Sequence, residues 1–201
     1  NNIYDNPDFA EIQMDLKAKL AELQKQYEDL PKDFMPNLMS EKTEHKALGA
    51  TVNFIHEPKP RYSHADLTDG LFWKFNSYVT PPGDTWLGFR ENDCEVILDL
   101  SEPKDFSQIS VNCYQNPSSW IYFPSKIEFY ISNDGESFDL AEQIDISSSD
   151  FKEGIQLFKT KENTQNARFI KIKTIALDSI PEGRPGAGKL PWVFLDEVIV
   201  E

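Results

Sequence analysis

The stretch Cys94-Glu95-Val96-Ile97-Leu98-Asp99-Leu100 decides the fold of this chain, because apolar and polar side chains alternate along it. Successive side chains of a β-strand point to opposite faces, so Cys94, Val96 and Leu98 share one face. The stretch Ile109-Ser110-Val111-Asn112-Cys113 repeats the alternation. Both cysteines are therefore expected to point into the interior of a β-sheet protein.

Alternation with a period of two recurs from residue 47 to residue 200, between clusters of Gly, Pro, Asn, Asp and Ser. The expected strands are 47–55, 95–100, 106–114, 126–132, 138–144, 168–175 and 192–200. The turn Ser132-Asn133-Asp134-Gly135 predicts a hairpin, since Gly accepts the positive φ of tight turns. Short strands with long polar loops predict a mostly β protein, an antiparallel jelly-roll β-sandwich over residues 46–201.

Residues 1–32 follow a helical period instead. The apolar positions spaced by three and four are Phe9, Ile12, Leu16, Leu20, Leu23 and Tyr27. Asn6 can cap this helix, and Pro7 suits its first turn. Residues 33–45 contain Pro36 and no periodicity, and we interpret them as a linker. The apolar stripe needs a partner, which we expect in a preceding catalytic domain.

Charge and composition exclude several classes of function. The chain has 34 acidic and 20 basic residues and a net charge of −14, which repels nucleic acid and anionic lipid. No apolar run reaches the length of a membrane span, so neither nucleic-acid binding nor membrane insertion is expected. The chain starts without Met or a signal-peptide pattern, so we expect a fragment or a mature form. No nucleophile, base and electrophile assemble, so the chain itself is not expected to be an enzyme.

The sequence leaves two arrangements open for Cys94 and Cys113, whose strands flank an expected turn around Pro103-Lys104. They can form a cross-strand disulfide, or remain two buried free thiols that pack as small hydrophobic side chains. Cysteine usage therefore does not fix the redox compartment.

An ordered series of motifs covers nearly all of residues 46–201. The motifs are Asp69-Gly70, Trp86-Leu87-Gly88-Phe89, Val96-Ile97-Leu98-Asp99-Leu100, Ser132-Asn133-Asp134-Gly135-Glu136-Ser137-Phe138, Ala167-Arg168-Phe169-Ile170-Lys171-Ile172 and Asp196-Glu197-Val198. The series resembles the discoidin, or coagulation factor five/eight type C, family of galactose-binding-like modules. The stretches Ser119-Trp120-Ile121-Tyr122-Phe123-Pro124 and Pro185-Gly186-Ala187-Gly188 look most like versions appended to bacterial glycan-degrading enzymes such as hexosaminidases. The resemblance implies a jelly roll that grips its ligand with loops at one end.

A second resemblance concerns the N-terminal segment. Asn2-Ile3-Tyr4-Asp5-Asn6-Pro7, followed by the expected helix, resembles the final helix of bacterial sulfatases, with Asp5 and Asn6 in reversed order. The sulfatase nucleophile motif Cys-x-Pro-x-Arg is absent, so any catalytic core lies outside this chain. Together the resemblances imply the C-terminus of a sulfatase or glycoside hydrolase that is secreted, periplasmic or on the bacterial cell surface.

The family resemblance also implies one structural calcium, with Asp69 and Glu197 as side-chain ligands. Calcium takes six to eight oxygens, so carbonyls of the turn between Asp66 and Trp73 are expected to contribute. No Cys or His pair offers the ligands that zinc prefers. In the alternative interpretation, Asp69 only caps a turn and Glu197 pairs with a lysine.

Sugars are recognised by aromatic faces bordered by planar hydrogen-bonding side chains. The loop residues with this chemistry are His64, Trp73, Arg90, Asn116, Trp120, Tyr122 and Arg184. Trp120 can instead belong to a strand edge that plugs the sandwich, and Trp86 and Trp192 are expected in the core. The three histidines, at positions 45, 56 and 64, show no metal or triad spacing and are expected to be solvated.

These observations predict a non-catalytic module that binds glycan and serves a parent enzyme. The alternative is a structural module that packs on the parent catalytic domain and has no sugar site of its own.

Overall fold

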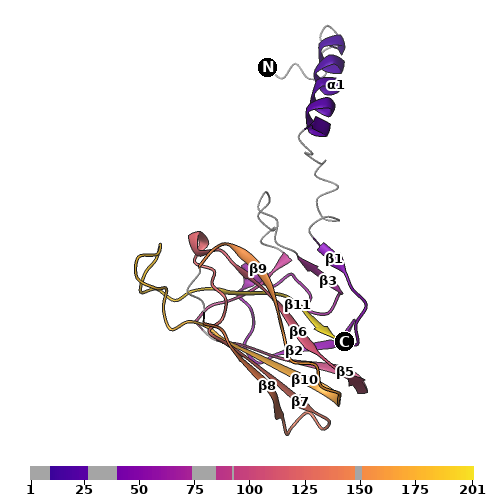
Figure 1. Ribbon diagram of the computed structural model, residues 1–201, viewed down its shortest axis with the longest axis vertical. Coiled ribbons are helices and arrows are strands. Elements are labelled where there is room, and N and C mark those ends of the chain that lie inside the picture. Colours follow the sequence, from indigo (N-terminus) through magenta and orange to yellow (C-terminus); the bar gives the residue numbers. More distant parts are fainter. Residues whose placement is uncertain (1–9, 27–39, 74–84, 92, 148–150) are drawn as a thin grey trace. The chain divides into compact units, whose positions relative to one another are not determined.

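The computed structural model describes residues 10–26, 40–73, 85–91, 93–147 and 151–201 (Figure 1). The chain divides into two compact units, Asn1–Leu38 and Met39–Glu201. The division falls inside the segment expected to be a linker, and each unit is described by itself below.

The first unit contains helix α1, Ala10–Gln26. The predicted helix is therefore confirmed, while the capping residues Asn6 and Pro7 lie outside the described residues. Lys19 and Asp15 form an i,i+4 ion pair of 2.8 Å on its surface. Four residues of the apolar stripe are 49–59% exposed: Ile12, Leu16, Leu20 and Leu23. None of the helices in the described ranges is long and apolar enough to span a bilayer.

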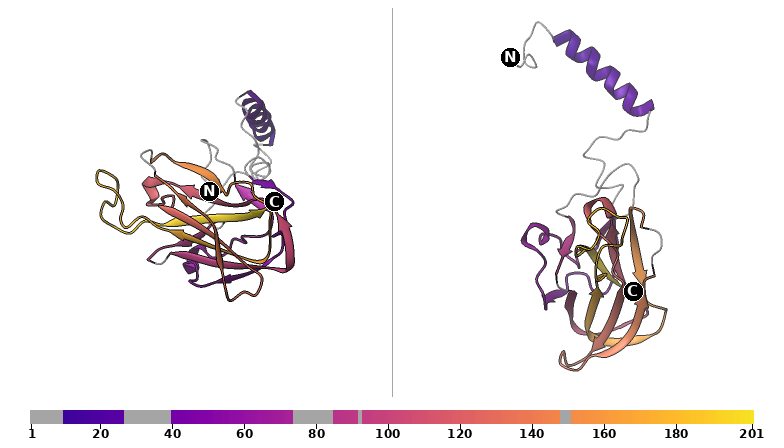
Figure 2. Two further views of the ribbon diagram at one scale, coloured as in Figure 1. Left: turned by 60° about the horizontal axis from the view of Figure 1, so that its bottom comes forward. Right: turned by 90° about the vertical axis from the view of Figure 1, so that its left-hand side faces the viewer.

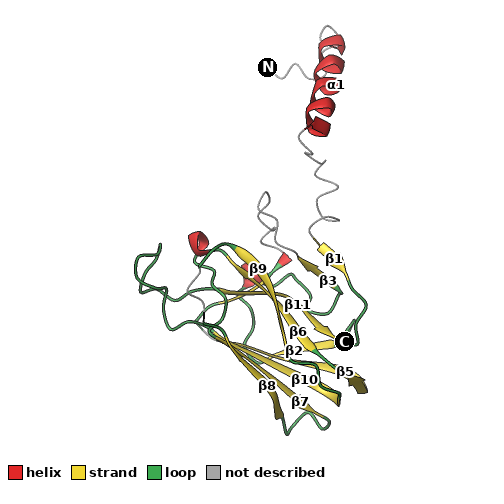
Figure 3. Ribbon diagram, in the orientation of Figure 1, coloured by secondary structure: helices red, strands yellow, loops and turns green. Residues whose placement is uncertain are grey.

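The second unit is an antiparallel β-sandwich of two main sheets (Figures 1 and 3). The five-stranded sheet has the order β2 (Thr51–Phe54), β5 (Cys94–Phe106), β10 (Gln165–Ile175), β7 (Lys126–Ser132) and β8 (Asp139–Asp145). The four-stranded sheet has the order β4 (Leu87–Phe89), β11 (Val193–Val200), β6 (Ile109–Gln115) and β9 (Gly154–Lys159). A separate ribbon pairs β1 (Ser40–Lys42) with β3 (Leu71–Trp73). This architecture confirms the predicted antiparallel sandwich.

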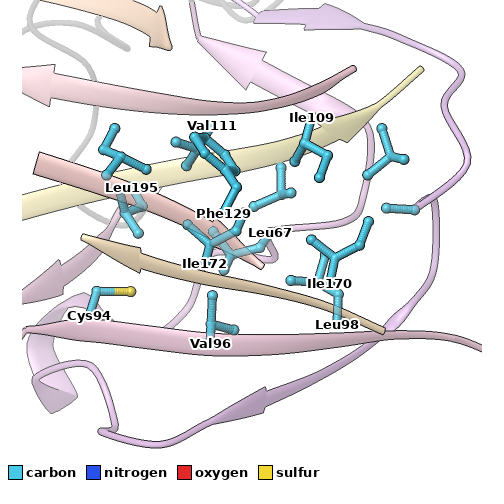
Figure 4. Packing of buried hydrophobic residues seen from close by; sticks show 14 of the residues in the cluster. Leu67, Cys94, Val96, Leu98, Ile109, Val111, Phe129, Ile170, Ile172 and Leu195 are labelled. Atoms are coloured by element: carbon cyan, nitrogen blue, oxygen red, sulfur yellow. The ribbon is translucent and has the colours of Figure 1, made fainter. Parts of the chain in front are cut away.

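The alternation of β5 produces the core. Cys94, Val96 and Leu98 are fully buried, while the intervening residues are partly exposed. They meet Ile172 of the same sheet and Val111 of the facing sheet in one apolar cluster (Figure 4). Full burial of each large aliphatic side chain contributes about 1.5–3 kcal/mol, so the space between the sheets supplies most of the stability.

The predicted hairpin turn joins β7 to β8. Gly135 has a φ of 77°, a conformation that non-glycine residues rarely adopt. The Asp134 carboxylate accepts hydrogen bonds from the backbone N–H groups of Glu136 and Ser137, both at 2.9 Å. The turn therefore forms through the residue types that predicted it.

Other boundaries differ from the prediction. Strand β5 continues through Pro103-Lys104, which the sequence placed in a turn, and strands β1, β3, β4 and β9 were not predicted. Strands β5 and β6 belong to opposite sheets, so Cys94 and Cys113 face the core from different layers. Both are buried free thiols, and burial raises the pKa of each. The structure therefore has the second of the two arrangements, in which Cys94 and Cys113 are buried free thiols.

Candidate functional site

Several loops meet at one end of the sandwich. They are η3 (Pro60–Tyr62), the segment after β4, η5 (Pro117–Ser119) and the loop of residues 176–192, which extends from the sandwich in Figure 1 and in the left view of Figure 2. Backbone bonds join these segments, since Trp192 N–H donates to the Trp120 carbonyl at 2.8 Å and Tyr122 N–H donates to the Trp192 carbonyl at 2.9 Å. This pairing places two tryptophans next to each other at the loop end.

Arg90 lies between these two tryptophans. Its guanidinium carbon is 5.4 Å from the ring centroid of Trp120 and 5.4 Å from that of Trp192, within the range of cation–π attraction. Arg90 Nε–H donates to the Leu190 carbonyl at 3.1 Å, which fixes the direction of the guanidinium. Tyr62 packs edge-on against Trp192 with ring centroids 5.2 Å apart. We call Arg90, Trp120, Trp192 and Tyr62 the Arg90 platform.

Two glycines make the platform sterically possible. A Cβ on Gly186 would lie 2.5 Å from Cε2 of Trp120, and one on Gly88 would lie 2.8 Å from Cβ of Tyr62. Trp120 itself has a φ of 64°, and the left-handed region costs a residue with a Cβ roughly 1–2 kcal/mol. Strain of this kind concentrates at binding sites, where the surrounding contacts hold it in place.

All four arginines of the chain lie over aromatic rings, and Arg168, at 4.7 Å from the Phe169 ring, also forms an ion pair. Arg168 makes an ordinary two-pronged ion pair with Asp99, with both N–O distances at 2.8 Å. Arg61 lies over the Tyr62 ring, and Arg184 lies over the Phe151 ring at 5.3 Å. Within the described parts of the chain, no carboxylate comes within ion-pair distance of the three loop arginines, Arg61, Arg90 and Arg184.

The structure brings together some of the residues that the sequence singled out. Arg90 and Trp120 meet in the platform, and Arg184 lies exposed in the loop that carries Gly186. His64 is exposed in the segment that follows η3. The positions of these four residues leave them available to a ligand.

Three other candidates do not present their side chains to solvent. Trp73 is 9% exposed and belongs to an aromatic cluster with Trp86, and Tyr122 is fully buried. The amide of Asn116 is engaged, since its Oδ1 accepts from Ser119 N–H and its Nδ2 donates to the Tyr114 hydroxyl at 3.0 Å. These side chains therefore support the loops from inside and offer no face to a sugar.

The sequence missed two members of the platform. Trp192 was expected in the core, and it packs against the buried aromatic cluster that contains Trp86, but it is only partly buried and also contacts Arg90. Trp86 is fully buried as expected. Tyr62 was not among the residues expected to bind a ligand. The run Pro60-Arg61-Tyr62, which pairs a cation with an aromatic ring in a loop, is the signal that could have indicated it.

A shallow hollow of about 360 Å³ lies elsewhere on the sandwich. It is lined by Phe123, Ile144, Asp145, Ile146, Ser147, Gln156 and Phe158. The rings of Phe123 and Phe158 pack edge to face there, and Asp145 is the ionisable lining residue. This hollow offers fewer hydrogen-bond donors to a saccharide than the Arg90 platform does.

Asp196 and Glu197 lie in a bulge of β11, because the pairing with β6 shifts register between Leu195 and Val198. The Asp196 carboxylate accepts from Trp73 N–H at 2.6 Å and from the amide of Asn112 at 3.0 Å. Burial raises the pKa of Asp196 to about 8 despite these bonds. The carboxyl is thus held in the protein interior.

Glu197 is buried beside His45. Its Oε1 lies 2.9 Å from His45 Nε2 and accepts from Gly70 N–H at 3.1 Å. Burial, together with the nearby carboxylates of Asp69 and Asp66, raises the pKa of Glu197 to about 9. The His45 side chain is fully buried, so the expectation that it is solvated was wrong, and burial lowers its pKa.

The residues around Glu197 fit a calcium ion by their chemistry. Glu197 Oε2 is buried without a hydrogen-bond partner, and an uncompensated buried carboxylate oxygen is costly. Asp69 is exposed and its Oδ1 accepts from Leu71 N–H, which leaves Oδ2 for a cation. In the described ranges no three His, Cys, Asp or Glu side chains converge, so backbone carbonyls would have to complete the shell. The carbonyls of Thr68 and Gly70 already accept backbone N–H groups and each keeps one lone pair.

No protein-family model matches the sequence, and a search of curated proteins finds no match. Solved structures share the fold. Chitosan-binding module 1 from the chitosanase/glucanase of Paenibacillus sp. IK-5 aligns with a TM-score of 0.51 and 13% identity over 79% of this chain and 99% of its own. CpGH89CBM32-6 from Clostridium perfringens aligns at 0.48 and 18% over 79% and 98%. CpGH89CBM32-5 from the same organism, in complex with GalNAc-β-1,3-galactose, aligns at 0.48 and 15% over 78% and 99%. At 13% identity the likeness to the chitosan-binding module shows a shared fold.

Proposed function

We propose that this chain is a non-catalytic accessory module that binds glycan at the Arg90 platform. The observation that carries the proposal is the position of Arg90 between Trp120 and Trp192 at the loop end of the sandwich. Neighbours of the same fold include a chitosan-binding module and a module complexed with a disaccharide, which supports a saccharide ligand.

The platform has the two kinds of group that saccharide binding requires. Indole faces pack against the C–H groups of a pyranose ring, and guanidinium N–H groups donate to its oxygens. A site on so few side chains binds weakly, with dissociation constants on the order of micromolar to millimolar. Tethering to an enzyme converts such weak binding into a useful local concentration.

Calorimetric titration of the chain with neutral and anionic oligosaccharides tests the proposal. Trp120→Ala should abolish the binding heat, while Leu140→Ala, at a residue 53% exposed on β8, should leave it unchanged. Absence of binding to every saccharide at millimolar concentration would refute a glycan-binding function.

We further propose that Glu197 and Asp69 hold one structural calcium, with carbonyls of the neighbouring turn. The ion would neutralise a buried carboxylate where the segment before β2 meets β11. The melting temperature should rise with calcium and fall with a chelator, and a melting temperature indifferent to both would contradict the site.

The parent protein is proposed to be a sulfatase or glycoside hydrolase that is secreted, periplasmic or on the bacterial cell surface. The exposed apolar stripe of α1 supports packing against another domain. The same observation favours the second candidate function, a structural module without a sugar site. If deletion of residues 40–201 destabilises the parent while the chain binds no sugar, this second function is the correct one.

A further inference from the structure

We propose that the ligand of this module is an anionic glycan, one that carries carboxylate or sulfate groups. The inference rests on the proposed function and narrows it to a class of saccharide. It is argued from the three loop arginines and from the charges that surround them.

The first observation is how the arginines are partnered. Arg168, on the sheet, is neutralised by Asp99, which is the usual fate of an arginine in an acidic protein. All four arginines lie over aromatic rings: Arg168 at 4.7 Å from Phe169, Arg61 at 5.4 Å from Tyr62, Arg90 at 5.4 Å from two indoles, and Arg184 at 5.3 Å from Phe151. The loop arginines differ from Arg168 in that no carboxylate of the described residues pairs with them. A ring holds a guanidinium in place without cancelling its charge.

The second observation is the orientation of Arg90. Its guanidinium carbon lies over the rings of both Trp120 and Trp192, and its Nε–H donates to the Leu190 carbonyl. The hydrogen-bond donors that remain for a ligand are the N–H groups of the two Nη atoms, which lie in the plane of the guanidinium. Such a fork matches the paired oxygens of a carboxylate or sulfate better than the single oxygen of a hydroxyl.

The third observation is the local charge balance. Glu91, next to Arg90, is bound by Lys59 at 2.7 Å, and Lys59 lowers the pKa of Glu91 more than Arg90 does, so the main partner of this carboxylate is Lys59. In the loop of residues 176–192, two acids are balanced by two bases: Asp178, Glu182, Arg184 and Lys189. Among the described residues of these loops, Arg61 and Arg90 remain as positive charge, partly offset by the Glu153 carboxylate that accepts from Asn116, in a chain whose net charge is −14. An anion is therefore attracted at this end, while the rest of the surface repels it.

The experiment is calorimetric titration of the whole chain with matched pairs of oligosaccharides. One pair is a uronic-acid oligosaccharide and its carboxyl-reduced neutral form, and the other is a sulfated oligosaccharide and its desulfated form. We expect at least one anionic member to bind about tenfold tighter than its neutral partner, and we expect added salt to remove that advantage. The pair that shows the preference identifies carboxylate or sulfate as the recognised group.

Substitutions of the arginines test whether these side chains produce the preference for the anionic oligosaccharide. Arg184→Gln and Arg61→Gln should each reduce the preference several-fold and leave neutral binding unchanged, because neither side chain is a member of the Arg90 platform. Arg90→Lys should keep the charge but lose most of the preference, since lysine lacks the planar fork. Lys161→Gln, which removes a charge at a side chain 91% exposed on the surface, is the matched control and should behave as wild type.

The outcomes distinguish a failure of the anionic-glycan inference from a failure of the proposed glycan-binding function. Equal affinity for neutral and anionic partners overturns the anionic class and leaves the glycan-binding function intact. Binding of no saccharide overturns the proposed function itself. Equal affinity for inorganic sulfate or for an unrelated polyanion such as DNA also overturns the inference, because it shows attraction to charge without recognition of a sugar.

Discussion

The contact between Gly186 and Trp120 gives the sharpest test of how the platform is built. Gly186 has a φ of +82°, and a Cβ there would lie 2.5 Å from Cε2, 2.6 Å from Nε1 and 3.0 Å from Cδ2 of the indole. Favourable contacts between heavy atoms are about 3.5–4 Å, so the indole has to move by roughly an ångström in Gly186→Ala. That movement separates Trp120 from the Arg90 guanidinium.

The same loop offers a matched control. Gly188 has a φ of +76°, and a Cβ there would meet no atom within 4 Å. Both alanine variants incur the left-handed strain of about 1–2 kcal/mol, but only Gly186→Ala adds the steric overlap, which costs roughly 1–3 kcal/mol more. With about 2–4 °C per kcal/mol for a domain of this size, Gly188→Ala should lower the melting temperature by roughly 2–8 °C and Gly186→Ala by more.

Binding separates the two variants more clearly than stability does. We expect Gly188→Ala to bind saccharide like wild type and Gly186→Ala to bind about tenfold more weakly, or 1.4 kcal/mol. The assay is titration below both melting temperatures, together with tryptophan emission as a report on the indole. Equal affinities of the two variants would show that saccharide binding does not require the packing of Trp120 on Gly186. That result would contradict the binding role of the Arg90 platform.

Three further predictions concern stability. Calcium at about 100 times its dissociation constant should raise the melting temperature by roughly 5–10 °C, and Glu197→Gln should remove that rise in calorimetric scans. The hydrogen bonds from Arg168 lower the pKa of Asp99, so the unfolded chain binds this proton more readily. The pair contributes fully above the unfolded pKa, and its contribution is lost as the pH falls through the lowered pKa of the folded state. Asp99→Asn should therefore melt slightly below wild type at pH 7, and the difference should shrink as the pH falls below the unfolded pKa. Cys94 and Cys113 should react with a thiol reagent only after unfolding, and reductant should not change the melting temperature.

The sandwich could be predicted because each long strand carries its own burial pattern. The alternation around Val96 and the turn at Gly135 are local properties of the sequence, and the structure keeps both. The missed strands β1, β3 and β4 have three residues each, which is too short to show a period. Pro103 misled the turn prediction, because a proline is tolerated in a strand where its missing N–H is not needed.

The candidate site could be predicted only in part, because its members meet through tertiary contacts. Arg90 and Trp120 were chosen for their chemistry in loops, which sequence alone displays. The role of Trp192 depends on its backbone pairing with Trp120 across 72 positions of chain, and that of His45 depends on Glu197, 152 residues away. No local pattern encodes such a meeting, so sequence reasoning placed Trp192 in the core and His45 in solvent.

Strand β11 connects the two chemically distinct regions of the module. Trp192 precedes its first residue, and the bulge at Asp196 and Glu197 interrupts its pairing with β6. The platform is nevertheless held by contacts of its own, namely the bond from Trp192 to the Trp120 carbonyl and the packing of Trp120 on Gly186. A cation at Glu197 would therefore stabilise the scaffold without setting the geometry of the platform. Loss of calcium should lower the melting temperature while glycan affinity at 25 °C stays the same, which separates the scaffold from the binding loops.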